Sequence, residues 1–206
     1  SHFFVLSALF AFEFKMGTEA IIVYPINAAA LLMLVIYLFN LGKKHFSDRN
    51  YLLGITYFVI ISVCLLLYTF WVNSPSPDII SAVLVLYSVV FFIELKGNYS
   101  LENTVLLAAL IFTAIVFKLS NTFLALLVLA ILVSYYNHKI RGLKKLFFST
   151  LVLAILIIGP FLARNFVLSG YLVYPLAKID LLDVDWKIPA SIVEEENVHI
   201  NTWAKI

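Results

Sequence analysis

The stretch Ile157–Pro175, IIGPFLARNFVLSGYLVYP, separates two kinds of sequence in this chain. An apolar run arrives from the N-terminal side and ends at Arg164-Asn165, and a short aromatic segment, residues 166–174, follows and is closed by Pro175. The residues before this stretch resemble membrane-spanning segments, and those after it are polar. We therefore expect a helix end at a bilayer surface, where a cation, an amide and aromatic rings gather.

The composition indicates a membrane protein. Of the 206 residues, 63% are hydrophobic and 13% are charged, whereas a soluble domain averages about 45–50% apolar and about 25% charged residues. One water-soluble core cannot enclose this excess, so the sequence predicts an all-α, polytopic integral membrane protein. The formal net charge of +2 favours no particular partner. We expect no nucleic-acid partner, because a lipid-exposed chain of this length has no room for a strongly basic face.

Six apolar runs are candidate spans, since a helix needs about twenty apolar residues to cross a bilayer. They are Ala20–Leu41, Tyr51–Val72, Pro77–Leu95, Thr104–Phe117, Thr122–Tyr136 and Leu146–Ala163. The fourth and fifth are short, so they are thin or tilted spans or a re-entrant pair that turns at Lys118. Phe3–Phe14 is too short to span and is expected to be an interfacial helix, or the stump of a cut one.

This pattern predicts a bundle of about six transmembrane helices over residues 1–163, preceded by the interfacial helix, and an outer-side segment with a polar tail over residues 164–206. With six spans the basic loops all fall on one side, which the positive-inside rule makes cytoplasmic. The residues concerned are Lys43, Lys44, Arg49, Lys96, Lys139, Arg141, Lys144 and Lys145. The tail is then outside. The chain is apolar from its start, with no signal-peptide pattern, so we expect a piece of a longer protein or a processed one.

Polar residues beside lipid are the candidates for chemistry, and several of them map to the predicted outer side. Asp78 follows Ser76-Pro77 at a predicted helix start, where it is either a plain helix-capping anion or a catalytic carboxylate. Lys118 interrupts an apolar run and either snorkels to the boundary or binds an anion. Arg164-Asn165 is either an interfacial anchor or a phosphate-binding group. Cys64 stands alone and the histidines have no ligand spacing, so we expect no metal and no cofactor.

Aromatic residues lie on the same predicted side. Tyr171 and Tyr174 follow the last span, and Trp186, between Asp185 and Lys187, would dock on the membrane or on a sugar ring. We expect Lys118 and Arg164 to face one cavity and to hold a lipid phosphate there. A sugar carbon on that phosphate would then be attacked by an acceptor hydroxyl, with a carboxylate as general base.

Three segments carry a resemblance to a known class: SPSPDIIS at 74–81, FKLS at 117–120 and RNFVLSGYLVYP at 164–175. They resemble bacterial polytopic glycosyltransferases of the GT-C class, near the protein O-mannosyltransferases and lipid A aminoarabinose transferases. The likeness extends from about Phe3 to Pro189 and implies a polyprenyl-phosphate sugar donor in a bacterial inner membrane. It also implies that Lys118 and Arg164, with Asn165 beside it, contact the lipid phosphate.

The resemblance has one further implication for catalysis. Enzymes of the GT-C class carry their catalytic acid in a first outer loop, which would precede Ser1, so this chain resembles an N-terminally truncated fragment. Asp78 is then the candidate replacement within it. Two other classes stay open. A transporter or lipid flippase component also fits kinked spans and a charge at Lys118, and a non-catalytic membrane subunit predicts no cavity lined by Lys118 and Arg164.

Overall fold

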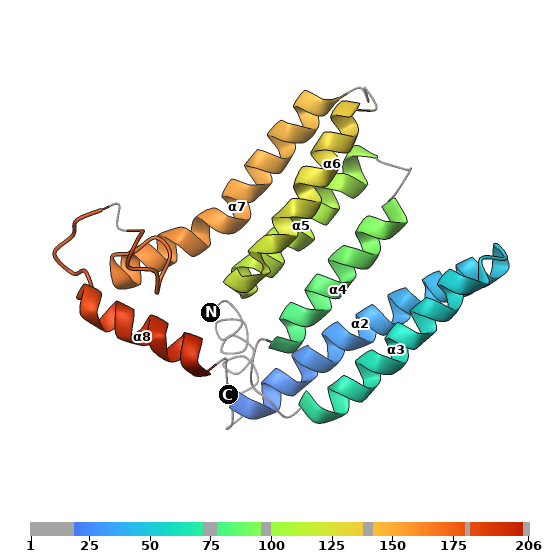
Figure 1. The fold of residues 1–206 in the computed structure, drawn as a ribbon, viewed down its shortest axis with the longest axis horizontal. Helices are drawn as coiled ribbons and strands as arrows, with labels where there is room; N and C mark the ends of the chain where they lie inside the picture. Colours follow the sequence, from blue (N-terminus) through green and yellow to red (C-terminus); the bar gives the residue numbers. More distant parts are fainter. Residues whose placement is uncertain (1–18, 72–77, 96–99, 138–141, 180–181, 204–206) are drawn as a thin grey trace. The chain divides into compact units, whose positions relative to one another are not determined.

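The computed structural model describes residues 19–71, 78–95, 100–137, 142–179 and 182–203. In these ranges the regular elements are helices, so the predicted all-α class is confirmed (Figure 1). They are α2 (Glu19–Ser47), α3 (Tyr51–Trp71), α4 (Asp78–Leu95), α5 (Leu101–Phe117), the 3-10 helix η1 (Leu119–Leu124), α6 (Ala125–Asn137), α7 (Leu143–Ser169) and α8 (Ala190–Trp203). The expected interfacial helix, Phe3–Phe14, lies outside the described residues.

Three of the described helices are long and apolar enough to cross a membrane: Asn27–Ser47 within α2, α4, and α7. The described apolar parts of the other three candidates, Tyr51–Leu66, Leu101–Phe117 and Leu119–Ser134, are shorter. Large apolar side chains on these helices are exposed, including Leu52 at 78% and Met33 at 69%. Contiguous apolar exposure of this kind suits lipid rather than water. Three spans are therefore supported, and about six stays a prediction.

The chain divides into two compact units, Ser1–Leu146 and Phe147–Ile206. The first holds α2 to α6, and the second holds most of α7 together with α8. The predicted boundary at residue 163 divides the membrane part from the part in outer water. Compactness of the two units does not test this boundary, which stays a prediction.

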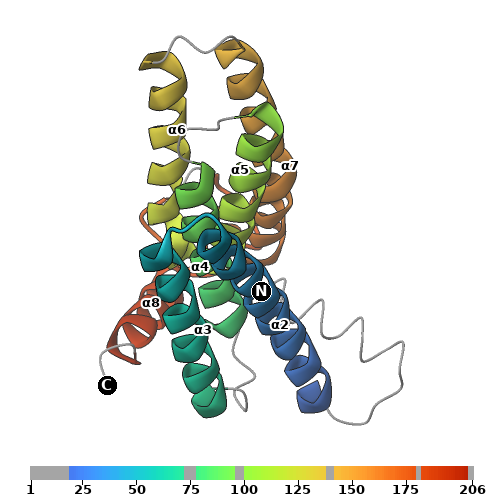
Figure 2. The same ribbon diagram turned by 90° about the vertical axis from the view of Figure 1, so that its right-hand side faces the viewer.

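Helices α2 and α3 form an antiparallel hairpin, and Figure 2 shows them meeting at their turn and diverging beyond it. Their shared core contains Leu34, Leu38, Tyr57 and Ile61, joined by Val90 of α4. Close approach near the turn depends on glycine, because a Cβ on Gly54 would lie 2.6 Å from the Phe46 ring.

The basic stretch at residues 42–50 differs from the prediction. The sequence predicts a loop there, but α2 continues through it to Ser47. Packing overrides the polar composition here, because the Phe46 ring lies against Phe58 and Tyr51 of α3. Lys44 and His45 then occupy the last helical turn, where cations complement the helix dipole.

Helices α5 and α6 form a second hairpin, which turns through Lys118 and η1 as the sequence predicts for that position. Helix α5 starts at Leu101, three residues before the predicted start, because the Ser100 side chain accepts from the Asn103 amide and caps it. Helix α4 packs against α5 and η1, as well as against α2. Within α5, Leu107 and Ile111 are fully buried, so this helix is at the centre of the first unit.

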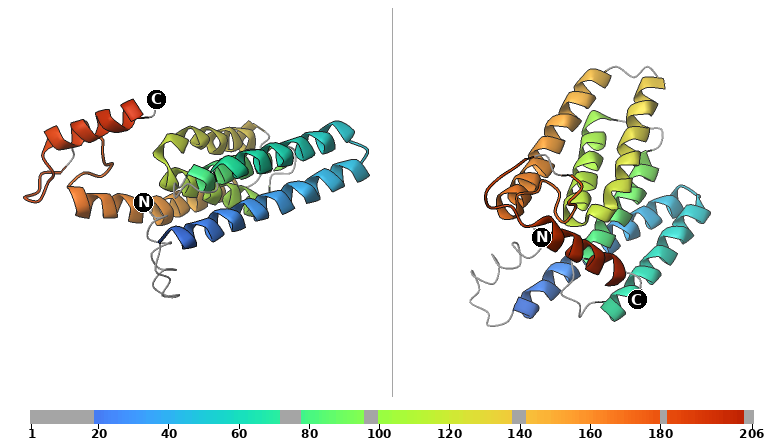
Figure 3. Two further views of the ribbon diagram at one scale, coloured as in Figure 1. Left: turned by 90° about the horizontal axis from the view of Figure 1, so that it is seen from below. Right: turned by 60° about the vertical axis from the view of Figure 1, so that its left-hand side comes forward.

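The predicted helix end at Arg164-Asn165 is wrong, because α7 continues through both residues to Ser169. A polar pair does not stop a helix whose backbone bonds can continue. The end is set by Gly170, whose positive φ of 77° turns the chain while its amide donates to the Phe166 carbonyl. The connection then folds back beside the end of α7 (Figure 3), where the Ile188 amide donates to the Ser169 carbonyl. Helix α8 lies in the predicted polar tail and buries Val193.

Replacing Gly170 with alanine is expected to lower the free energy of unfolding by about 2 kcal/mol, because a side chain at positive φ is strained. The added Cβ would also lie 2.9 Å from the Lys187 Cα. Reversible unfolding in mixed detergent micelles measures the change. Gly159→Ala is the matched control, because a Cβ there meets no atom within 4 Å. Equal stability of the two variants would contradict the assigned role of Gly170.

Candidate functional site

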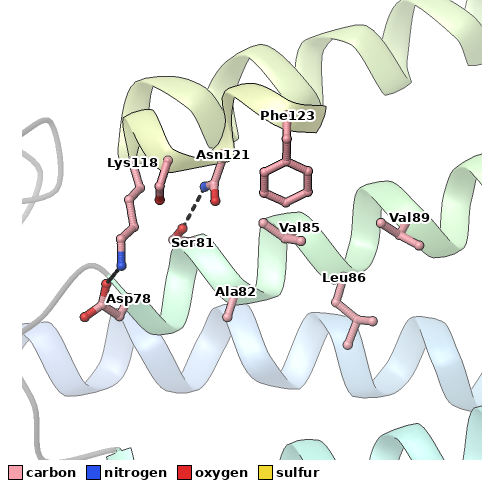
Figure 4. A pocket seen from close by; sticks show the side chains of 10 residues that line it. Asp78, Ser81, Ala82, Val85, Leu86, Val89, Lys118, Asn121 and Phe123 are labelled. Atoms are coloured by element: carbon pink, nitrogen blue, oxygen red, sulfur yellow. Dashed lines mark hydrogen bonds and ion pairs between the residues drawn. The ribbon is translucent and has the colours of Figure 1, made fainter. Parts of the chain in front are cut away.

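An ion pair joins two elements that are distant in sequence. Lys118, at the junction of α5 and η1, donates from Nζ to Oδ1 of Asp78, the first residue of α4, over 2.5 Å. Figure 4 shows the two side chains reaching toward each other across the end of a hollow. The Lys118 and Asp78 side chains are 48% and 40% exposed. Solvent therefore screens the pair, and its contribution to stability is small.

A buried amide holds the turn beside this pair. Asn121 in η1 is 5% exposed, and its Nδ2 donates to Ser81 Oγ over 2.8 Å and to the Ala114 carbonyl over 2.9 Å. One side chain thus ties η1 to α4 and to α5. Since Lys118 lies three residues before Asn121, these bonds fix the backbone from which the lysine extends.

The hollow that these residues border has a volume of about 500 Å³. Its polar end contains Asp78, Lys118, Ser81, Ser120 and Asn121, and its apolar wall contains Ala82, Val85, Leu86, Val89 and Phe123. The wall follows α4, and the eight helical steps from Ser81 to Val89 extend about 12 Å along the helix. The hollow is therefore amphipathic, with charge at one end and an apolar track leading away from it (Figure 4).

The other predicted phosphate-binding residues belong to the second unit. Arg164 and Asn165 lie in α7 and are half-buried. The Asn165 carbonyl accepts from Ser169 Oγ over 2.7 Å, and its side-chain amide makes a long contact of 3.5 Å with the Leu172 carbonyl. A cavity shared by Lys118 and Arg164 would lie between the two units, so it stays a prediction.

The predicted aromatic residues have different environments. Tyr171 is only 2% exposed, and its hydroxyl donates to the Ile188 carbonyl over 3.1 Å. This residue packs inside the second unit, and its place on the acceptor side stays a prediction. Trp186 is 57% exposed and lies edge-on to the Phe166 ring at 6.1 Å between centroids. Its indole remains accessible to a membrane or a sugar.

Tyr174 is half-buried and its hydroxyl donates to the Glu196 carboxylate of α8. The hydrogen bond to this carboxylate, with a smaller effect of burial, raises the pKa of Tyr174 to about 12. The neutral hydroxyl is therefore favoured. The stabilisation from this contact is fully present at pH values below the ordinary tyrosine pKa, and it is lost as the pH rises through the raised pKa of Tyr174.

The family of the chain can be stated from its sequence. A family model described as Domain of unknown function (DUF8201) matches residues 1–206. The chain belongs to this family. No curated protein and no solved structure matches it significantly.

A second polar cluster was missed by sequence reasoning. Glu94, in the last turn of α4, accepts at Oε1 from the Tyr57 hydroxyl over 2.6 Å and from His45 Nε2 over 2.9 Å. The three residues tie the ends of α2 and α4 to the second turn of α3. The His45 and Glu94 side chains are 13% and 15% exposed. The sequence held one signal of this cluster, because Glu94 is an acid within the apolar run Pro77–Leu95. His45 lies in the stretch that the sequence predicts as a loop.

The chemistry open to the amphipathic hollow follows from its groups. Among the described residues that line it, Asp78 and Lys118 are charged, so it offers one cation and one carboxylate. In the part of the chain that the structure describes, no three side chains of His, Cys, Asp or Glu gather at a metal-binding distance. Lys118 can bind an anion, Asp78 can accept a proton, and the track can accommodate an apolar chain.

Proposed function

We propose that this chain binds a polyprenyl-phosphate-linked sugar in the hollow beside α4, as the membrane part of a glycosyltransferase. The observation that carries the proposal is the position of Lys118 at the polar end of an apolar track. A lipid that joins an anionic head to a long apolar chain is complementary to this arrangement. Three apolar helices long enough to span a bilayer support access to such a lipid.

The contacts divide between the two ends of the lipid. The Lys118 ammonium supplies charge-assisted donors to the phosphate, which are stronger than neutral hydrogen bonds. The prenyl chain lies along Val85 and Val89, where each buried CH₂ contributes about 0.8 kcal/mol. The lipid therefore enters from the bilayer with its head at the boundary.

Transfer would occur at that boundary. The acceptor oxygen forms a bond to the anomeric carbon of the sugar as the bond from that carbon to the phosphate oxygen breaks, and the lipid phosphate leaves with the electron pair. Asp78 is the candidate to accept the hydroxyl proton. Arg164 would provide a second cation, and Tyr174 and Trp186 would lie on the acceptor side. In this arrangement the basic loops are cytoplasmic and the C-terminal tail is outside the inner membrane.

The test is binding of undecaprenyl phosphate to the chain in nanodiscs. Replacing Lys118 with glutamine is expected to weaken binding about tenfold, because it removes the cation and keeps a polar side chain that is one atom shorter. Titration monitored by tryptophan fluorescence gives the dissociation constant. Undecaprenol, which has the chain without the phosphate, should bind the unchanged protein weakly.

The matched control is Lys144→Gln, the same substitution at an exposed lysine in the first turn of α7. It is expected to leave the dissociation constant unchanged. Equal affinity of the Lys118→Gln variant and the unchanged protein would contradict the proposal, and so would equal affinity for undecaprenol and its phosphate.

A further inference from the structure

We infer that Asp78 and the lipid phosphate compete for Lys118, so that the ion pair is a latch which the bound lipid opens. The inference rests on the proposed function, and it adds regulation to the same site. It assigns Asp78 a role before any chemistry, because the carboxylate occupies the lysine until the lipid binds. The predicted consequence is unusual: removing this acid should improve lipid binding.

The geometry of the pair favours competition. The Asp78 carboxylate contacts Lys118 Nζ at 2.5 Å, and a phosphate oxygen bound to the same ammonium needs a similar distance. With the carboxylate still in place, two negative groups would lie within a few ångströms of each other, which is unfavourable. Lys118 is the one cation among the described residues that line the hollow, so carboxylate and phosphate compete for its ammonium even with Arg164 as a second cation on the phosphate. The phosphate therefore has to displace the carboxylate.

The surroundings allow the pair to open without unfolding the turn. Both side chains are more than one-third exposed, so the pair is weak and the released carboxylate can be solvated. The backbone beneath Lys118 is held separately, because Asn121 bonds to Ser81 and to the Ala114 carbonyl. The backbone of the turn therefore stays in place while the Asp78–Lys118 pair opens. Once displaced, Asp78 is no longer neutralised by the lysine and can accept a proton from an acceptor hydroxyl.

The experiment compares the affinity for undecaprenyl phosphate after removing the negative charge and after removing the positive charge of the ion pair. Asp78→Asn is expected to bind undecaprenyl phosphate about three- to tenfold more tightly than the unchanged protein, because it removes both the competitor and the repulsion. Lys118→Gln is expected to bind about tenfold more weakly. In the Lys118→Gln background the Asp78→Asn change should tighten binding less than it does in the unchanged protein, since there is no cation to release and only the repulsion is removed. Inorganic phosphate at the same concentration should not displace the lipid, because it lacks the apolar chain.

Asp48→Asn is the matched control, an identical substitution at an exposed acid in the turn after α2, and it should leave affinity unchanged. Asp78→Ser provides a second variant, with the same expected tightening, should asparagine perturb the start of α4. Unchanged affinity in both Asp78 variants overturns the latch, and weaker affinity overturns it by showing that Asp78 holds the ligand. If the Lys118→Gln variant binds undecaprenyl phosphate as tightly as the unchanged protein, the proposed function fails as well. If Lys118→Gln binds more weakly but Asp78→Asn binds with unchanged affinity, only the latch is contradicted.

Discussion

Replacing Glu94 with alanine is expected to lower the free energy of unfolding by about 3 kcal/mol, because breaking a largely buried polar cluster leaves its other members unpaired. Glu94 accepts from both His45 and Tyr57 through one oxygen. Without that oxygen, two donors on two other helices lose their partner in a region with little exposure. The ends of α2 and α4 and the second turn of α3 then lose a shared contact.

Glu94→Gln separates the loss of charge from the loss of the acceptor. Glutamine keeps an oxygen that can accept from Tyr57 and His45, so this variant should lose about 1 kcal/mol, less than alanine. Reversible unfolding in mixed detergent micelles measures both variants. Glu102→Ala is the control, because Glu102 is an exposed acid in the first turn of α5, and the change should stay within about 0.5 kcal/mol. A loss as small in Glu94→Ala as in the control would refute the assigned role of the cluster.

Replacing Asn121 with alanine is expected to cost about 3 kcal/mol, because it removes two buried hydrogen bonds at once. The amide joins Ser81 of α4 and the Ala114 carbonyl of α5, and each of these groups would lose a donor. The loss should also reach the hollow. With η1 no longer fixed, Lys118 would sample more positions and bind an anion less well, although alanine removes no charge.

Two measurements test this variant together: unfolding in mixed micelles and titration with undecaprenyl phosphate. Ser120→Ala is the control, because Ser120 adjoins Asn121 and borders the same hollow, but is exposed. It should change stability by less than about 0.5 kcal/mol. If Asn121→Ala unfolds as easily as expected yet binds the lipid with full affinity, Asn121 supports the fold without positioning the lysine.

The sequence was sufficient for the helical class and for the position of several elements. The capping pattern at residues 76–78 identified α4 to within one residue of its start, and the interruption at Lys118 correctly marked the turn between α5 and α6. These features depend on long apolar runs and on charges that lipid excludes. The sequence placed Asp78 and Lys118 on one predicted side without predicting a contact between them, and the structure joins them in an ion pair.

Other features could not be derived from local composition. The basic stretch at residues 42–47 and the pair Arg164-Asn165 both lie inside helices, because packing of Phe46 and the glycine turn at Gly170 decide where those helices end. The contact of Glu94 with His45 needs the fold of three helices, and no spacing in the sequence indicates it. Tyr171 similarly has the sequence position of a boundary aromatic, and only the folded-back connection buries it.

The two contacts between α4 and the turn share a property with a consequence for evolution. Asp78 and Lys118 are separated by 40 positions, and so are Ser81 and Asn121. Any insertion or deletion between residues 81 and 118 therefore changes both separations by the same number. Homologues that keep both contacts should show one common separation, whatever its length. Unequal separations would mean that α4 had shifted along the turn, so that the ion pair and the amide hydrogen bond were no longer made at the same spacing.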